Sequence, residues 1–189
     1  MTQKRLMYTL FTLCAFIILS NKSQAQLSTS RIFNSGAVLQ RNVDIPVWGT
    51  GEPNAEISVR LNTLIQTSTA DSDGKWQVLL PASQAGGPFE MEIISNEQTI
   101  TYHDVYIGDV WLASGQSNME MAVNQSNNGS TEIASANNEL IREFKIPKSL
   151  ANEPSDQIIA GSVWKAANKS NVGNFSATAY YFAKHIQPE

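Results

Sequence analysis

The sequence predicts a β-sandwich over residues 26–107, followed by an incomplete α/β domain with a parallel sheet over residues 108–189. Short segments before residue 107 alternate apolar and polar side chains with period two, which is typical of antiparallel strands. Residues 109–113 instead form one continuous, largely apolar run, as in a strand buried on both faces of a parallel sheet. Only about 80 residues remain for the second domain, fewer than the roughly 100 to 150 that most single domains contain.

The first domain is predicted to contain five strands separated by turn-forming residues. The clearest alternation places Ile57, Val59 and Leu61 on one face of a strand. Gly, Pro, Asn and Asp residues lie between the strands, where the backbone must reverse. The expected strands are residues 43–48, 56–61, 75–80, 89–94 and 99–106. This pattern favours a small all-β sandwich.

The second domain is predicted to alternate strands and helices. After the strand at residues 109–113, we expect a helix over residues 132–142, a short strand near 144–146 and a second helix that begins near Ser176. The sequence reaches residue 189 directly after that helix, whereas a right-handed βαβ unit would next need a strand that returns to the sheet. We therefore expect this α/β domain to be incomplete.

Residues 1–25 have the pattern of a secretory signal peptide. A Lys4-Arg5 pair precedes an apolar run over residues 6–19, and Ser23-Gln24-Ala25 provides a small-x-small cleavage site. An uncleaved membrane anchor is the alternative, but the apolar run is shorter than the roughly 20 residues that span a bilayer. We expect cleavage near Ala25 and export to the periplasm or the extracellular space.

The composition argues against several classes of partner. The 189 residues carry a formal net charge of -4 without any run of Lys and Arg, which argues against binding nucleic acid or an anionic membrane. Cys14 is the single cysteine and lies inside the predicted signal peptide, so the mature chain should have no disulfide and no thiol ligand. The sequence contains no metal-binding or phosphate-binding motif. We therefore expect no metal, no cofactor and no membrane association after cleavage.

The residues best placed for chemistry are Ser114-Gly115-Gln116-Ser117-Asn118-Met119, which follow the predicted buried strand. A serine at the carboxyl end of a parallel strand lies where open α/β sheets bind their ligands. Gly115 permits a tight turn, and the backbone amides after it can face the developing oxyanion of an ester. Ser117 is therefore the candidate nucleophile. On these grounds alone, an ordinary turn between a strand and a helix explains the same residues at least as well.

Residues 108–120, GDVWLASGQSNME, resemble the nucleophile block of the sialate O-acetylesterase family, a branch of the SGNH-type hydrolases. Further segments resemble the same family in the same order, so the resemblance spans nearly all of the mature chain. They are Phe33 with residues 38–41, then residues 46–49, 70–76, 86–89 and 175–182. The matches include several Trp and Gly positions, which makes the resemblance specific.

The resemblance implies a serine hydrolase that removes O-acetyl groups from sialic acid or a related sugar through an acetyl-enzyme. Ser117 matches the family's nucleophile, and its own N–H would be one oxyanion donor. Gln116 and Asn118 would shape the turn or bind the substrate. The resemblance also implies an SGNH-like α/β fold and an acetylated glycan as the partner.

The chain departs from the family in the base that a serine nucleophile needs. In the family this base belongs to an Asp-x-x-His block near the C-terminus, and no such block is present here. His103 and Asp104 are adjacent on a predicted strand and should point to opposite faces, so they cannot easily form a dyad. His185 lies near a helix end, where a surface role beside the helix dipole is expected. We expect the chain to be the N-terminal part of such an enzyme and inactive alone.

Two other functions stay open at this point. A glycan-binding module or pseudoenzyme would leave Ser117 without a catalytic role, and an acetylesterase could act on other acetylated polysaccharides instead of sialic acid. Trp48, Trp76 and Trp111 could form a sugar-binding platform, but their positions in or beside strands favour a role in the core.

Overall fold

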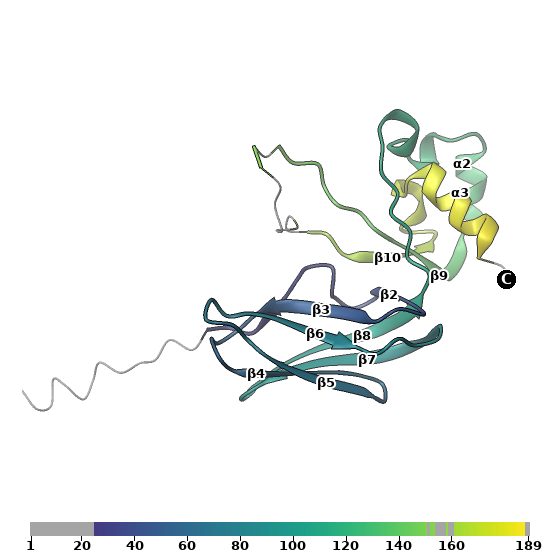
Figure 1. The fold of residues 1–189 in the computed structure, drawn as a ribbon. Coiled ribbons are helices and arrows are strands. Elements are labelled where there is room, and N and C mark those ends of the chain that lie inside the picture. Colours follow the sequence, from purple (N-terminus) through teal and green to yellow (C-terminus); the bar gives the residue numbers. More distant parts are fainter. Residues whose placement is uncertain (1–24, 151, 154–157, 159–160, 188–189) are drawn as a thin grey trace, which may run out of the picture.

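The computed structural model describes residues 25–150, 152–153, 158 and 161–187 of the chain. The predicted signal peptide, residues 1–25, lies outside the described residues except for Ala25. The described chain forms a β-rich lower part and an upper part that contains the helices (Figure 1). Each part has its own cluster of buried apolar side chains.

Two sheets make up the β-rich part. The first is antiparallel, and its strands in spatial order are β1 (Ser28–Thr29), β3 (Ile45–Thr50) and β6 (Lys75–Leu80). The second has the order β2 (Val38–Gln40), β8 (Gln98–Gly108), β7 (Gly86–Ser95), β4 (Glu56–Leu61) and β5 (Leu64–Thr69). This sheet is mixed, because β2 pairs with β8 in parallel while the other strands pair antiparallel.

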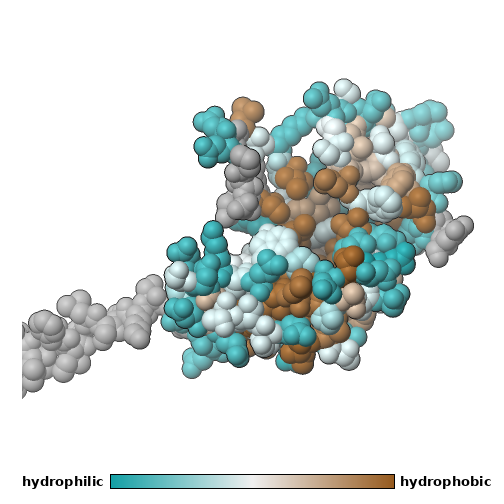
Figure 2. All heavy atoms as spheres, viewed as in Figure 1, coloured by the Kyte–Doolittle hydropathy of each residue, from teal (hydrophilic) through white to brown (hydrophobic). Residues whose placement is uncertain are grey.

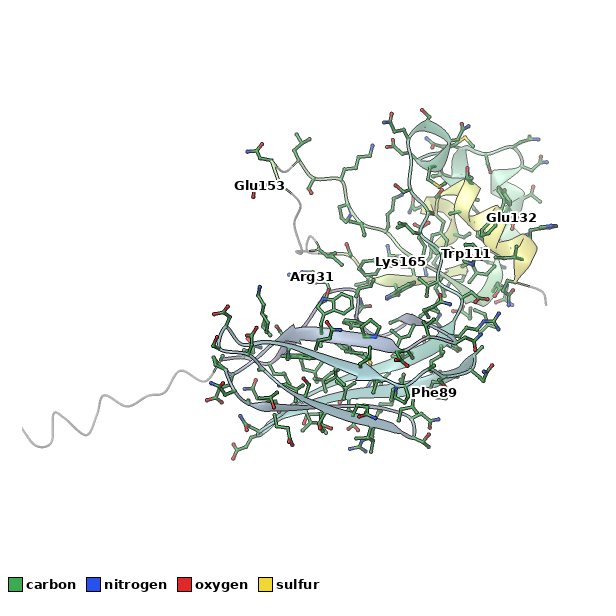
Figure 3. All side chains as sticks on the ribbon, viewed as in Figure 1. Arg31, Phe89, Trp111, Glu132, Glu153 and Lys165 are labelled. Carbon is green, nitrogen blue, oxygen red and sulfur yellow. The ribbon has the colours of Figure 1, made fainter. Side chains whose placement is uncertain are left out.

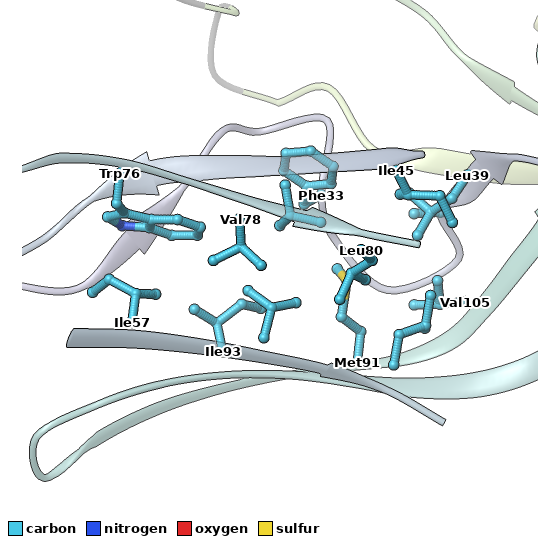
Figure 4. Packing of buried hydrophobic residues seen from close by; sticks show 14 of the residues in the cluster. Phe33, Leu39, Ile45, Ile57, Trp76, Val78, Leu80, Met91, Ile93 and Val105 are labelled. Atoms are coloured by element: carbon cyan, nitrogen blue, oxygen red, sulfur yellow. The ribbon is translucent and has the colours of Figure 1, made fainter. Parts of the chain in front are cut away.

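The main core lies between these sheets because the central strands bury every second side chain. The inward residues of β6 include Trp76 and Val78, which are at most 3% exposed. Ile57 of β4 and Ile93 of β7 face them from the opposite sheet (Figure 4). Burying one aliphatic side chain of this size contributes about 1.5–3 kcal/mol, so the shared core holds the two sheets together.

The upper part consists of short elements around a pair of antiparallel strands. These strands are β9 (Asn137–Phe144) and β10 (Trp164–Asn168). The helical elements are η1 (Ser117–Met119), η2 (Val123–Gln125), α2 (Gly129–Ser135), η3 (Val172–Asn174) and α3 (Ala177–Ile186). Their core includes Val123, Ile141, Val172, Phe175 and Tyr180. Among the residues that the structure describes, no helix has the length and apolar character needed to cross a membrane.

The predicted α/β domain with a parallel sheet is wrong. Residues 109–113 form no strand, and Trp111 and Leu112 are 63% and 90% exposed. β9 and β10 are antiparallel, and the described residues of the upper part contain no parallel sheet. A continuous apolar run cannot by itself distinguish a buried strand from a segment that no other strand covers. The start of this run is instead fixed beside the end of β2, where Arg41 Nε lies 2.8 Å from Asp109 Oδ1.

Of three further predictions about the architecture, one fails, one is not confirmed and one holds. The helix expected over residues 132–142 is wrong beyond its first turn, because α2 ends at Ser135 and β9 begins at Asn137. The sandwich is not confirmed, because the five-stranded sheet curls until β5 lies beside β6, as in half of a barrel (Figure 1). The helix near Ser176 is confirmed: Ser176 caps α3, and its Oγ accepts a hydrogen bond from Ala179 N. The division of the chain at residue 108 stays a prediction.

β9 connects the two parts of the molecule through side chains on its opposite faces. Ile141 belongs to the upper core, whereas Arg142 reaches the β-rich part. Arg142 Nη1 donates to Gly36 O at 3.0 Å and to Asp104 Oδ2 at 2.7 Å. The guanidinium carbon lies 4.4 Å from the centre of the Tyr106 ring. Because the Arg142 side chain is 4% exposed, these protein groups replace water around its charge.

We predict that Arg142→Ala lowers the free energy of unfolding by about 2–4 kcal/mol, because the buried carbonyl of Gly36 loses its donor and the junction loses its ion pair. Urea unfolding followed by tryptophan fluorescence measures the change. Arg60→Ala is the control. Arg60 pairs with Glu92 at 3.2 Å but is 48% exposed, so its loss should change the free energy by less than about 1 kcal/mol. Equal effects of the two substitutions would contradict this role of Arg142.

Candidate active site around Ser117

Ser117 lies at the end of the extended segment that leaves β8, and it is the first residue of the single-turn helix η1. Its φ angle is +47°, in the left-handed region that side chains other than Gly rarely adopt. Gly115, two residues earlier, has a φ angle of +150°, and a Cβ atom there would contact Met119. The backbone therefore turns sharply at Gly115 and Ser117 and leaves the Ser117 side chain exposed to solvent.

The first turn of α3 fixes the segment that carries Ser117. Thr178 Oγ1 donates a hydrogen bond to Asn118 O at 3.0 Å. Ser176 Oγ donates to Met119 Sδ at 3.4 Å. Because α3 is docked in the upper core, these contacts hold η1 in place even though η1 buries no residue of its own.

Several polar groups around Ser117 have no partner in the described part of the chain. They are the Ser117 hydroxyl, the side-chain amides of Gln116 and Asn118, and the backbone N–H groups of Ser117 and Asn118. N–H groups at the start of a helix lack intrahelical acceptors, so they remain available to a ligand. An ester that approaches the hydroxyl would find hydrogen-bond donors for its oxyanion on the same turn.

Neither histidine is paired with the candidate nucleophile in the described structure. His103 Nδ1, on β8, lies 3.0 Å from the Glu90 carboxylate on β7. Asp104 pairs with Arg142 instead, so His103 and Asp104 do not form a dyad. His185 lies exposed in the last turn of α3. Within the same described ranges, no side chain accepts a hydrogen bond from the nucleophile's hydroxyl as a general base would, and no group of three His, Asp or Glu residues could hold a metal ion.

Glu143 contributes to this region, although nothing in the sequence pattern singled it out. Its Oε2 accepts a hydrogen bond of 2.8 Å from Ser176 N, at the N-terminal cap of α3. Burial raises the pKa of the Glu143 carboxyl. The hydrogen bond from Ser176 and the charges of Lys145 and Lys165 act in the opposite direction but do not cancel the effect of burial. The structure therefore places a perturbed carboxyl group directly against the helix that holds η1.

Glu132 joins the two α-helices of the upper part (Figure 3). Its Oε1 accepts hydrogen bonds from Lys184 Nζ and Tyr180 Oη, both at 2.6 Å. These bonds, led by the one from Lys184, hold the pKa of Glu132 below its usual value. Burial, followed by the contact with Glu132, raises the pKa of Tyr180 well above its ordinary value. The cluster fixes α3 against α2 and so supports the turn of α3 that contacts η1.

The three tryptophans considered from the sequence differ in exposure. Trp76 is 3% exposed and lies in the core, as predicted. Trp48 and Trp111 are 40% and 63% exposed, so the prediction that they belong to the core is wrong for both. Trp111 packs edge-on against Phe182 of α3, with ring centres 5.1 Å apart. Figure 2 shows further apolar side chains on the surface of the upper part and near its junction with the β-rich part.

Comparisons with known proteins identify relatives over most of this chain, although no protein family model matches it. Sialate O-acetylesterases from Pongo abelii and Homo sapiens are each 31% identical over 171 residues, which cover 81% of this chain and 33% of each relative. The sialate O-acetylesterase from Mus musculus is 33% identical over 157 residues, or 74% of this chain and 29% of that relative. The crystal structure of a carbohydrate acetylesterase from Xanthomonas citri has a TM-score of 0.82 and 41% identity, over 85% of this chain and 37% of the other. The chain thus spans about one third of the length of these curated relatives.

We predict that Glu143→Gln gains stability relative to the native chain as the pH rises from about 4 to 7. Because the folded-state pKa of Glu143 is raised, the stability that this carboxyl contributes is fully present below its unfolded pKa. That contribution is lost as the pH rises through the folded-state pKa, and the Gln side chain has no such loss. Urea unfolding of both proteins at a series of pH values measures the difference. A difference that is constant across this range would contradict the raised pKa.

Proposed function

Because the chain belongs to a sialate O-acetylesterase-like family, we propose that Ser117 is the nucleophile of a serine hydrolase that removes O-acetyl groups from a carbohydrate. The observation that carries the proposal is the turn at Ser117. There an exposed hydroxyl lies on left-handed backbone, next to N–H groups that have no acceptor in the described chain. The acetyl group would be carried by sialic acid or a related sugar, since the relatives are sialate O-acetylesterases and a carbohydrate acetylesterase.

The proposed reaction passes through an acetyl-enzyme. Ser117 Oγ attacks the acetyl carbonyl carbon while a base accepts the hydroxyl proton, and the carbonyl oxygen becomes an oxyanion. The Ser117 N–H donates to this oxyanion, and the side-chain amides of Gln116 and Asn118 bind the substrate. The bond between the acetyl carbon and the sugar oxygen then breaks, and the sugar leaves as an alcohol after it takes up a proton. Water attacks the acetylated serine, which releases acetate and restores the hydroxyl.

The 189-residue chain alone is proposed to be inactive, because a serine hydroxyl is a weak nucleophile without a base. In the described residues both the His103 and Asp104 side chains already have other partners. The relatives are about three times as long as the matched region, so the base is proposed to come from outside the residues matched here. Export after cleavage near Ala25 belongs to the same proposal, since residues 1–25 have the pattern of a signal peptide.

We predict Ser117-dependent acetate release from an O-acetylated sialic acid when the protein is expressed from the complete coding frame of its gene. Ser117→Ala should lower the rate at least about 10³-fold, because the nucleophile is lost. The 189-residue chain alone should release no more acetate than its own Ser117→Ala variant. Parallel assays with acetylated xylan test whether the enzyme prefers acetylated sialic acid or an acetylated polysaccharide. Full activity of Ser117→Ala would contradict the assignment, and Ser117-dependent activity of the short chain would contradict its proposed inactivity.

Glycan binding without catalysis is a second candidate function, and the exposure of Trp48 favours it. The indole lies on the outer face of β3, 40% exposed and in edge contact with Phe33 at 4.7 Å between ring centres. Gln77 lies opposite Trp48 on β6, and Lys75 lies opposite Thr50. Polar side chains thus flank an exposed aromatic ring, which suits a sugar that stacks its C–H face on the ring and bonds through its hydroxyls.

If the chain binds glycans in this way, Trp48→Ala should weaken its retention by an acetylated polysaccharide about tenfold, or about 1.4 kcal/mol. Affinity electrophoresis with the polysaccharide in the gel measures the retention. Leu79→Ala is the control, because Leu79 is a 52% exposed apolar residue on the neighbouring strand β6. Equal retention of the native chain and Trp48→Ala would exclude this face as the binding site.

A further inference from the structure

The two faces of β9 hold different parts of the molecule. Arg142 points towards the β-rich part and donates to Gly36 O and Asp104 Oδ2. Glu143 is the next residue and points the other way, because successive side chains of a strand alternate. Its carboxylate meets Ser176 N at the start of α3. The position of β9, which Arg142 fixes, therefore also fixes the position of the Glu143 carboxylate.

Ser176 connects Glu143 to the candidate nucleophile. Its N–H donates to Glu143 Oε2 at 2.8 Å, and its hydroxyl donates to Met119 Sδ at 3.4 Å. Ser176 also forms an antiparallel bridge with Ala122, just after η1. Met119 is the last residue of the single turn that Ser117 begins. A short series of contacts thus leads from the carboxylate to the turn that orients the hydroxyl.

A carboxylate is not the group that packing alone would favour at this position. Glu143 shares its face of β9 with Ile141, which is buried in the upper core, and burial raises the pKa of Glu143. Lys145 and Lys165 are the charged neighbours that favour its ionised form, and α3 has no acidic residue in its first turn. Carboxyl groups perturbed by burial and by specific partners are frequent at functional sites.

We propose that Glu143 is a positioning residue for Ser117, and that it acts through Ser176 and the single turn of η1. This inference rests on the proposed function, because it takes Ser117 as the nucleophile and adds the residue that orients it. The ionised carboxylate holds Ser176 N by a charge-assisted hydrogen bond. Protonation of Glu143 weakens that bond and loosens the turn between Ser117 and Met119.

A pH titration of the full chain by amide NMR tests this connection. In the native chain the amide signals of Ser176, Met119 and Ser117 should shift with pH around one common midpoint, which is the pKa of Glu143. In Glu143→Gln none of these signals should follow that titration. Glu139 lies at an exposed position of the same strand, so Glu139→Ala should titrate with the same midpoint as the native chain. Unrelated midpoints, or the same titration in Glu143→Gln, would overturn the proposal.

Hydrogen exchange measures how firmly the turn is held. The Met121 amide donates to Ser117 O at 3.0 Å, and its exchange should be about tenfold faster in Glu143→Ala. Glu143→Gln should restore slow exchange, because its amide oxygen can still accept from Ser176 N. The amides of Val59 and Ile93, which lie in paired core strands, report whether Glu143→Ala remains folded. If Glu143→Ala unfolds, the pH titration of the native chain and of Glu143→Gln tests the proposal instead.

Unchanged Met121 exchange in a folded Glu143→Ala protein would overturn the proposal. Neither measurement uses catalysis, so the outcome is separate from the test of the acetylesterase activity. Ser117→Ala makes the separation explicit. It should abolish acetate release by the complete protein, yet the titration of the Ser176 and Met119 signals should keep the midpoint of the native chain.

Discussion

At the junction of the two cores, Arg142 buries a guanidinium group whose side chain is 4% exposed. A guanidinium does not lose its charge in a protein, so its donors need acceptors wherever water is excluded. Gly36 O, Asp104 and Glu139 O supply these acceptors, and the Tyr106 ring covers one face of the group. Gly36, Asp104 and Tyr106 belong to the β-rich part, whereas Arg142 belongs to β9. Arg142 can therefore contact all three residues only in a narrow range of positions of β9. The arrangement of the helices around Ser117 follows from that position.

The strands β3, β4, β6, β7 and β8 could be predicted because period-two alternation is a local property of the sequence, whereas β1, β2 and β5 were not expected. The segments expected at residues 56–61 and 75–80 coincide with β4 and β6. In the upper part the local pattern does not match the structure, because residues 109–113 have no partner strand among the described residues and stay exposed. Residues 137–144 carry side chains that suit a helix as well as a strand, and pairing with β10 decides between the two. Pairing of this kind depends on tertiary structure that a local pattern does not encode.

The candidate site could be predicted as far as Ser117 and its turn, because Gly115 and the residues after it are contiguous in the sequence. The contacts that support the turn join distant residues. Ser176 lies 57 residues from Met119, and Glu143 lies 33 residues from Ser176. Glu143 is an ordinary charged residue when the sequence is read alone, and its role follows only from the place where α3 begins. Trp48 was expected in the core but is exposed, for the same reason. The position of a residue in a strand does not show which face of the sheet is covered by other elements.

The positions of the Arg142 acceptors in the sequence also bear on the order in which the two parts of the chain assemble. Gly36 and Asp104 both precede the end of β8, and among the described residues the two sheets of the β-rich part contain no strand beyond β8. The strand pairs of that part therefore all lie within residues 28–108, although Trp164 of β10 also packs against its core and donates through Nε1 to Ile32 O at 2.8 Å. β9, in contrast, has no low-energy site for its guanidinium until those acceptors have been assembled. We therefore expect the β-rich part to fold first and β9 to dock on its surface.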